Sequence, residues 1–229
     1  MANSENHLIQ MLPLQDRLSL LAIGKPVALD MSKILCEPGT PTRYVYFPTE
    51  GFISLVARTD TGPGVEVGMV GREGMLGAHL ALGVVVAPLR ALVQGQGMAL
   101  RVSTAAFRKE LASSPSLQQG LDRYLYVLMA QMATSVACLR SHAIGPRLAR
   151  WLLMTQDRAH SDSFRVTHEF LAYMLGVRRV GVTNAAGALQ QDGLIAYRRG
   201  NLQVLDRRGL EVEACGCYAI DRRIYKKLL

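Results

Sequence analysis

The chain has 229 residues, of which 49% are hydrophobic and 19% charged, and its formal net charge is +8. This composition is typical of a folded globular protein and excludes disordered and collagen-like chains. The longest apolar stretch, residues 80–89, is much shorter than the roughly 18 residues that a transmembrane helix requires, and the first residues lack the basic and apolar regions of a signal peptide. We therefore expect a cytoplasmic protein with no membrane partner.

The first half of the chain reads as a small antiparallel β structure. Short β-branched or aromatic runs, punctuated by Gly and Pro, occupy residues 44–47, 51–56, 65–70, 89–94 and 98–102. Strands of this length and spacing predict a β-sandwich or barrel. We expect one helix before it, around residues 14–21, and one after it, around residues 104–112.

Residues 117–142 predict one long helix. Apolar positions recur at alternating spacings of four and three, which is the pattern of a helix that pairs along its length. Two readings remain open, because the same stripe would also form if the helix packed on its own β domain. We interpret it as a dimer interface made by Leu121, Leu125, Leu128, Met132, Ser135 and Leu139.

After a helix that begins near Pro146, the sequence predicts a helix-turn-helix. Thr167 is a good N-cap for a helix over residues 168–175, and Gly176 is a typical C-terminal glycine. A second helix is predicted over residues 178–192. Two short helices joined in this way suit a DNA reader, because the second helix can enter the major groove.

Several side chains of this motif are suited to nucleic acid. The exposed half of the second helix carries Arg178, Arg179, Thr183 and Asn184, and Arg and Asn are the types that bond guanine and adenine bidentately. We expect Thr167 and these four residues to lie at the DNA.

A β-hairpin should follow the second helix and make the motif winged. Residues 194–199 and 202–205 flank Gly200-Asn201, which predicts a tight turn, and Arg198 and Arg199 would lie near phosphate. We expect a last helix over residues 210–219 and a mobile basic tail. Residues 146–229 hold 14 Lys and Arg against 8 Asp and Glu, whereas residues 1–118 hold 10 against 9. The basic part is the one expected to bind a polyanion.

With these motifs in place, the sequence resembles the bacterial Crp-Fnr transcription regulators. The resemblance is most specific in Leu-Gly-Val-Arg-Arg-Val-Gly-Val-Thr-Asn-Ala-Ala from residue 175 and in Gln-Asp-Gly-Leu-Ile-Ala-Tyr-Arg-Arg-Gly from residue 191. It extends to Tyr-Phe-Pro-Thr-Glu-Gly from residue 46 and Val-Gly-Arg-Glu-Gly-Met-Leu-Gly from residue 70.

The resemblance implies an α+β fold in three parts. These are an N-terminal antiparallel β-roll of the cyclic-nucleotide-binding type over residues 1–116, a dimerisation helix over 117–145 and a winged helix-turn-helix over 146–229. It also implies a homodimer that binds double-stranded DNA at an inverted repeat and contacts RNA polymerase.

Individual residues can be carried over from the cyclic-AMP-binding members of the family. Arg179 matches the arginine that those members place on a guanine. Val180 stands where they have a base-reading glutamate, and Asn184 where they have a second arginine. The half-site should therefore differ from theirs.

The sensor part departs further from those members. Gly71, Glu73 and Arg90 are the candidates for effector binding, but the Arg-Ser pair that holds the cyclic phosphate is missing and Pro-Leu-Arg-Ala occupies its region. A buried phosphate without an anchored cation is poorly compensated, so we expect an unknown small-molecule effector rather than cyclic AMP. An iron-sulfur cluster is not expected because no cysteine precedes Cys36, whereas haem ligation by His79 stays open.

We expect no cofactor, no metal site and no catalytic residue. Cys215 and Cys217 are separated by one residue, which fits poorly with the usual spacing of zinc ligands, and the four cysteines form no disulfide pattern. No nucleophile elbow or zinc-protease motif is present in the sequence. The alternative to a DNA-binding regulator is a ligand sensor whose basic domain docks on a protein or an RNA.

Overall fold

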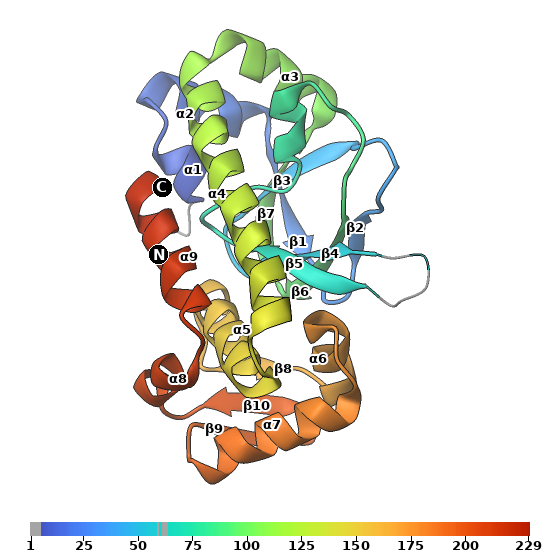
Figure 1. Ribbon diagram of the computed structural model, residues 1–229. Helices are drawn as coiled ribbons and strands as arrows, with labels where there is room; N and C mark the ends of the chain where they lie inside the picture. Colours follow the sequence, from blue (N-terminus) through green and yellow to red (C-terminus); the bar gives the residue numbers. More distant parts are fainter. Residues whose placement is uncertain (1–5, 59, 61–63) are drawn as a thin grey trace. The chain divides into compact units, whose positions relative to one another are not determined.

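The computed structural model describes residues 6–58, 60 and 64–229 (Figure 1). The chain folds into two compact units. The first contains the residues up to Leu55, Gly68–Met129 and Tyr225–Leu229, and the second contains Val56–Val67 and Ala130–Ile224. The division falls inside the longest helix. Within the part of the chain that the structure describes, no helix is long and apolar enough to span a membrane.

Most of the first unit is a β-roll made from two antiparallel sheets. One sheet has the order β1-β7-β3 and the other has the order β2-β6-β4-β5. The strands are β1 Lys25–Leu29, β2 Ile34–Cys36, β3 Tyr44–Pro48, β4 Phe52–Ala57, β5 Val65–Val70, β6 Arg90–Gly95 and β7 Gly97–Ser103. Every β run expected from the sequence is present, with ends that differ by one or two residues at most.

Short helices and one long helix accompany the roll. They are α1 His7–Gln10, α2 Leu14–Ile23, the 3-10 helix η1 Ala78–Leu82, α3 Thr104–Ser113 and α4 Pro115–Ser141. The core of the unit joins residues from all of these elements. Phe47 of β3 and Phe107 of α3 meet with ring centroids 6.3 Å apart, and both are fully buried.

The start of α4 is fixed to the roll by a close approach of backbone and aromatic ring. Tyr124 is fully buried, and a Cβ built on Gly74 would lie 2.3 Å from its hydroxyl oxygen. The Asn6 side chain donates to the carbonyl of Gly74 at 2.7 Å and to that of Pro48 at 3.0 Å. Glycine at position 74 is therefore what lets α4 pack here.

The second unit is built from helices around a small sheet. Its helices are α5 Ile144–Ala159, α6 His168–Leu175, α7 Arg179–Gln191, α8 Arg207–Glu213 and α9 Cys217–Leu228. The strands β8 Ser163–Arg165, β9 Ile195–Arg198 and β10 Asn201–Val204 form an antiparallel sheet of order β8-β10-β9. The mixed α+β fold predicted from the sequence is confirmed.

Two local expectations need correction. The expected single helix over residues 210–219 is two helices, because the chain leaves helical geometry between Glu213 and Cys217, and the tail expected to be mobile is the second half of α9. The hairpin turn is Arg199-Gly200 rather than Gly200-Asn201, since Asn201 pairs with Arg198 as the first residue of β10.

Candidate nucleic-acid interface

The helix-turn-helix forms where the sequence places it, and local signals explain its ends. The Thr167 hydroxyl caps α6 by accepting from the N–H of Phe170 at 3.1 Å. Gly176 ends α6 with φ of 61°, in the left-handed region that favours glycine. Arg147 of α5 donates to the carbonyl of Leu175, which satisfies one of the last acceptors of α6.

One face of α7 is buried and the opposite face is free. Val182, Ala186 and Leu189 are at most 2% exposed, and their spacing of four and three places them on one side of the helix. Arg178, Arg179, Val180 and Asn184 are exposed. Arg178 is the N-cap and its side chain makes no capping hydrogen bond, so the first N–H groups of α7 are available to an anion.

Val180 is the unusual member of this exposed face because its apolar side chain is 64% exposed. It lies in the first turn of α7, beside Arg179. An apolar side chain at the start of a reading helix is suited to the methyl group of thymine.

Thr183 differs from the expectation because it is already engaged within the protein. Its hydroxyl donates to the carbonyl of Arg179 at 3.1 Å, and its oxygen lies 3.0 Å from Nδ1 of His168. With the hydroxyl proton used, the oxygen accepts from the Nδ1–H tautomer of the imidazole. Thr183 therefore joins α7 to α6, although its side chain remains exposed.

His168 is a residue of this interface that the sequence analysis missed. Its ring stacks on Tyr197 of the wing with centroids 4.4 Å apart and planes 17° apart, and the Tyr197 hydroxyl donates to the carbonyl of Val166 at 2.9 Å. Burial, and then the charge of Arg179, lower the pKa of His168, so the ring stays neutral at pH 7. A lone histidine at a helix start carries no sequence signal for such a stack.

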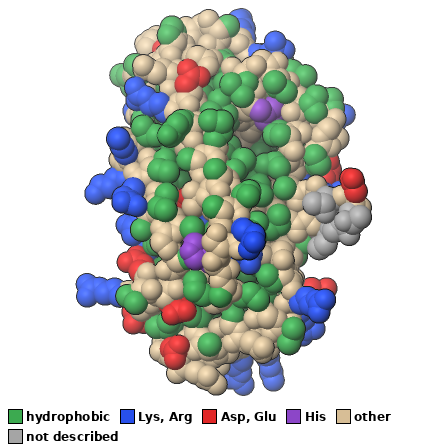
Figure 2. Space-filling model, viewed as in Figure 1, with side chains coloured by type: hydrophobic (Ala, Val, Ile, Leu, Met, Phe, Trp, Pro, Cys, Tyr) green, Lys and Arg blue, Asp and Glu red, His purple; other side chains and the backbone are tan. Residues whose placement is uncertain are grey.

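The wing places two arginines at the tip of a two-residue turn. Arg199 and Gly200 have φ of 51° and 82°, which is the type I′ geometry of a tight hairpin. The backbone of Arg199 is strained in this turn, because a positive φ is disfavoured for a residue other than glycine. Arg198 and Arg199 are both exposed. In Figure 2, Lys and Arg side chains also project from the edge of the molecule where Figure 1 draws α7.

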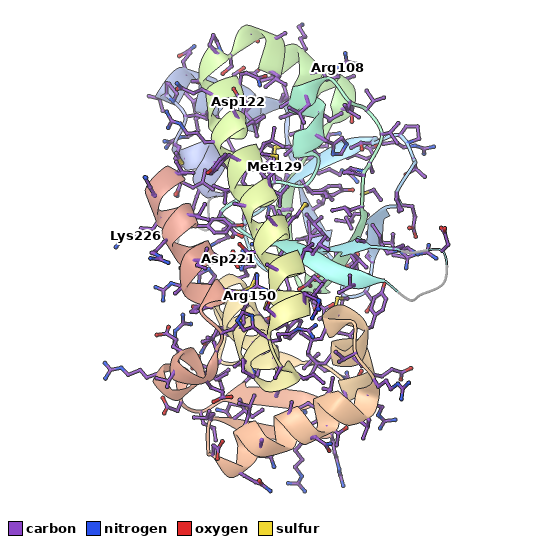
Figure 3. The ribbon with its side chains drawn as sticks, in the orientation of Figure 1. Arg108, Asp122, Met129, Arg150, Asp221 and Lys226 are labelled. Atoms are coloured by element: carbon purple, nitrogen blue, oxygen red, sulfur yellow. The ribbon has the colours of Figure 1, made fainter. Side chains whose placement is uncertain are left out.

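The predicted dimer stripe of α4 is partly buried within the protomer, and a second apolar stripe lies one residue further along the helix. Leu121 and Ser135 are 1% and 6% exposed, and Ser135 accepts from Arg150 at 3.2 Å, so both belong to the interior of the protomer. The large apolar side chains of α4 that are exposed are Tyr126, Met129 (labelled in Figure 3) and Val136, at 57%, 62% and 60%.

The remaining residues of the predicted stripe are intermediate in solvent exposure. Leu125, Leu128, Met132 and Leu139 are half-buried. A repeat of four and three defines two neighbouring stripes equally well, and only the packing of α4 on its own unit decides which of them is free.

The three residues proposed for effector binding are occupied by contacts inside the protein. The carboxylate of Glu73 accepts from the N–H of Gly71 at 3.1 Å, as part of a local turn. Arg90 forms a two-point ion pair with Glu37, with N–O distances of 2.7 Å and 3.0 Å. Because Glu37 already balances its charge, Arg90 is a poor anchor for a cyclic phosphate.

His79, which was left open as a haem ligand, is engaged as well. Its Nε2 lies 2.9 Å from the hydroxyl of Thr42, and burial lowers its pKa. This contact accounts for the histidine as part of the interior of the β-roll.

Four side chains with metal-binding atoms come together elsewhere in the second unit. They are Cys138, His142, Cys215 and Cys217, whose ligand atoms all lie within 4.8 Å of one another. The sequence analysis considered Cys215 and Cys217 only as a pair.

Taken together, an exposed basic reading helix, a basic wing and a β-roll define a DNA-binding regulator with a sensor-type domain. Comparison with known proteins agrees. Residues 146–213 match the Crp-like helix-turn-helix domain. The sequence relatives that span most of the chain are named as regulators, which supports the resemblance to the Crp-Fnr transcription regulators drawn from the sequence motifs.

The similar proteins extend beyond the DNA-binding part. The global nitrogen regulator of Synechocystis is 26% identical over 196 residues, which are 76% of this chain and 82% of that protein. The transcriptional regulator SdrP of Thermus thermophilus is 24% identical over 199 residues, covering 82% of this chain and 94% of that protein. The solved structure of FixK2 from Bradyrhizobium japonicum has the same fold, with a TM-score of 0.71 at 14% identity over 84% of this chain and 98% of that one. Both sequence relatives are named as regulators.

Proposed function

We propose that the chain is a homodimeric regulator that binds an inverted-repeat site in the cytoplasm, with α7 of each protomer in one major groove. The observation that carries this proposal is the free face of α7, on which Arg179, Val180 and Asn184 are exposed while the opposite face is buried. Each of the three side-chain types has a complementary group on a base edge: guanine for Arg, adenine for Asn and the thymine methyl group for Val.

The remaining contacts of the proposed complex are to phosphate. Arg198 and Arg199 on the wing and the uncapped first turn of α7 at Arg178 would bind the backbone and add affinity without sequence preference. Thr167 would contribute by holding the first turn of α6 in place. RNA polymerase is the expected partner of the DNA-bound dimer.

The dimer would form through the exposed stripe of α4, made by Tyr126, Met129 and Val136. Tyr126, Met129 and Val136 are three and seven positions apart, so they lie along one side of the helix and can pair with the same stripe of a second copy. A dimer of this kind sets two reading helices about 34 Å apart, which is one turn of DNA.

The effector is a small molecule other than cyclic AMP, because Arg90 is paired with Glu37. Because Arg90 is already paired with Glu37, we expect the protein to bind DNA without cyclic AMP. The test of this part is therefore made without any added ligand.

The first experiment selects bound duplexes from a random library with the purified chain at near-physiological salt. An enriched inverted repeat supports the proposal. Salt-sensitive binding without enrichment contradicts sequence-specific reading by the unliganded chain and favours a basic domain that docks on another partner.

The second experiment separates base reading from phosphate binding on the selected site. Arg179→Ala should cost about 1–3 kcal/mol on that site and little on random DNA, whereas Arg198→Ala should cost the same on both and reduce the salt slope. Replacing thymine by uracil in the site removes the methyl group, and it should weaken the wild type but not Val180→Ala. Equal losses for Arg179→Ala on both DNAs would contradict a base contact.

The third experiment tests the dimer with two matched valines. Val136 on α4 is 60% exposed and Val212 on α8 is 87% exposed. Val136→Glu should give monomers in analytical ultracentrifugation and lose binding to the repeat, while Val212→Glu should stay dimeric. Dimers of unchanged strength in Val136→Glu would contradict the α4 interface.

A further inference from the structure

The cluster of Cys138, His142, Cys215 and Cys217 is assembled from two distant parts of the sequence. Cys138 lies in the last turn of α4, and His142 follows one turn later, with its N–H donating to the carbonyl of Cys138 at 3.1 Å. Cys215 lies between α8 and α9, and Cys217 is the first residue of α9. The second pair meets the first only because the chain returns to the end of α4 after the wing and α8.

The three sulfur atoms are withdrawn from solvent. Cys138, Cys215 and Cys217 are 2%, 8% and 7% exposed and form a buried cluster of their own. Cysteines packed merely as small hydrophobic residues would be expected to mix with Leu, Ile and Val. Here the sulfur of Cys138 lies against that of Cys215, and the sulfur of Cys217 lies against the imidazole of His142.

Two distances between these ligand atoms are close to the edges of a tetrahedral zinc site. Sγ of Cys138 and Sγ of Cys215 are 3.4 Å apart, and Sγ of Cys217 is 3.8 Å from Nδ1 of His142. Four ligands around Zn²⁺, with Zn–S about 2.3 Å and Zn–N about 2.0 Å, lie about 3.8 Å apart for two sulfurs and about 3.5 Å apart for sulfur and nitrogen. The sulfurs are also too far apart for a disulfide, whose S–S bond is about 2.05 Å.

Positive charge surrounds the sulfurs. Arg147 and Arg150 of α5 both lie close enough to Cys138 and Cys215 to interact with them electrostatically. Three thiolates and one divalent cation carry a net charge of −1, and Arg147 offers the nearby charge that balances it.

We propose that Cys138, His142, Cys215 and Cys217 bind a single Zn²⁺ ion in a closed, structural Cys3His site. Four protein ligands leave no open position for water, so the site holds structure and is not catalytic. Thiolate and imidazole ligands exclude Mg²⁺ and Ca²⁺, which take oxygen. An iron-sulfur cluster is excluded by size, because its ligands are divided among two or more irons and cannot all lie within 4.8 Å of one another.

The expectation of no metal site rested on the unusual spacing of Cys215 and Cys217 and on the absence of known zinc motifs in the sequence. Cys138 and His142 supply the other half, at the i and i+4 positions that bring two ligands to one side of a helix. The proposal does not rest on DNA binding, and its tests do not use DNA.

The first test is the metal content of the full chain, purified without chelator and under a phosphine reductant that keeps the thiols free. Elemental analysis should give one zinc per chain for the wild type and for Cys36→Ser, which removes the one cysteine outside the cluster. The double variant Cys215→Ser/Cys217→Ser should lose this one zinc per chain. Equal zinc in the double variant and the wild type would place the metal elsewhere and overturn the proposal.

The second test uses Co²⁺ as a spectroscopic probe on the metal-free wild type. Tetrahedral thiolate ligation should give intense visible ligand-field bands and a near-ultraviolet sulfur-to-cobalt charge-transfer band, both lost when Zn²⁺ is added. His142→Ala retains all three sulfurs, so it should keep the charge-transfer band, shift the visible bands and bind more weakly. Absence of both bands in the reduced wild type would overturn the proposal whether or not any variant folds.

Discussion

The buried ion pair between Arg150 of α5 and Asp221 of α9 offers a sharp test of the energetics of the second unit (Figure 3). The two charges meet at 2.6 Å, and the side chains are 10% and 5% exposed. At an effective dielectric constant of about 20, opposite charges about 4 Å apart attract by about 4 kcal/mol. Removing one partner of such a pair typically costs about 3–5 kcal/mol, because the other charge stays buried.

The two single variants should differ in their dependence on pH. Burial raises the pKa of Asp221, and Arg150 is the main group that opposes this, with help from Arg158 and the hydroxyl of Thr134. Arg150→Met removes the opposition, so the folded-state pKa of Asp221 rises further above its unfolded value. A group with a raised folded pKa stabilises fully below the unfolded pKa and loses that contribution as the pH rises through the folded pKa.

The deficit of Arg150→Met relative to the wild type should therefore grow as the pH rises above the folded-state pKa of Asp221 in the wild type, by at most about 1.4 kcal/mol per pH unit. Asp221→Leu leaves a guanidinium that stays charged throughout this range, so its deficit should be constant. The double variant, Arg150→Met/Asp221→Leu, should recover most of the loss because no unpaired charge remains.

Urea unfolding followed by tryptophan fluorescence is the assay. The chain has one tryptophan, Trp151, which is 5% exposed and lies beside Arg150 on α5, so the signal reports on this unit. A deficit of Arg150→Met that does not change between pH 4.5 and 7.5 would refute the reasoning, as would a double variant no more stable than the two singles.

Three further predictions follow from single positions. Arg199→Asn should raise the unfolding free energy by about 0.5–1 kcal/mol, because asparagine tolerates the left-handed backbone better, yet weaken binding to all DNA alike; an unchanged unfolding curve would contradict the strain. The lowered pKa of His168 means stability that is present above about pH 6.5 and lost as the pH falls below it, and this loss should be absent from His168→Phe. Gly74→Ala should cost about 1–3 kcal/mol by collision with buried Tyr124, whereas Gly120→Ala, which meets no atom within 4 Å, should stabilise α4 by about 0.5–1 kcal/mol.

The parts of the fold that the sequence predicts well are those with local causes. The helix α6 begins and ends where expected because Thr167 and Gly176 act within one turn of the backbone. The strands β3 to β7 were predicted because β-branched runs between turn residues suffice to define them. The basic face of α7 was predicted because the buried positions Val182 and Leu189 carry a helical period.

The features that the sequence analysis missed depend on contacts between distant residues. The stack of His168 on Tyr197 joins the start of α6 to the wing, and no sequence pattern around either residue predicts this contact. Leu121 and Ser135 of the predicted α4 stripe are buried within the protomer, and the heptad pattern does not specify which of its positions pack internally. Cys138 and Cys215 are 77 positions apart, so a search for ligand spacing within a short motif could not connect them.

The last turns of α4 are held to the DNA-binding unit by two separate kinds of bond. Arg150 of α5 links Ser135 of α4 to Asp221 of α9 through hydrogen bonds of 3.2 Å and 2.6 Å. One turn further along, Cys138 meets Cys215, just before α9. Both links join the end of α4 to the C-terminal segment. That segment therefore fixes the helix that carries Val136 to the unit that carries α7.

A change at the sulfur cluster would loosen one link and leave the other, and Arg150→Met would do the reverse. If the two links act on the same joint, combining Arg150→Met with Cys215→Ser/Cys217→Ser should therefore give a loss of stability that is not the sum of the separate losses.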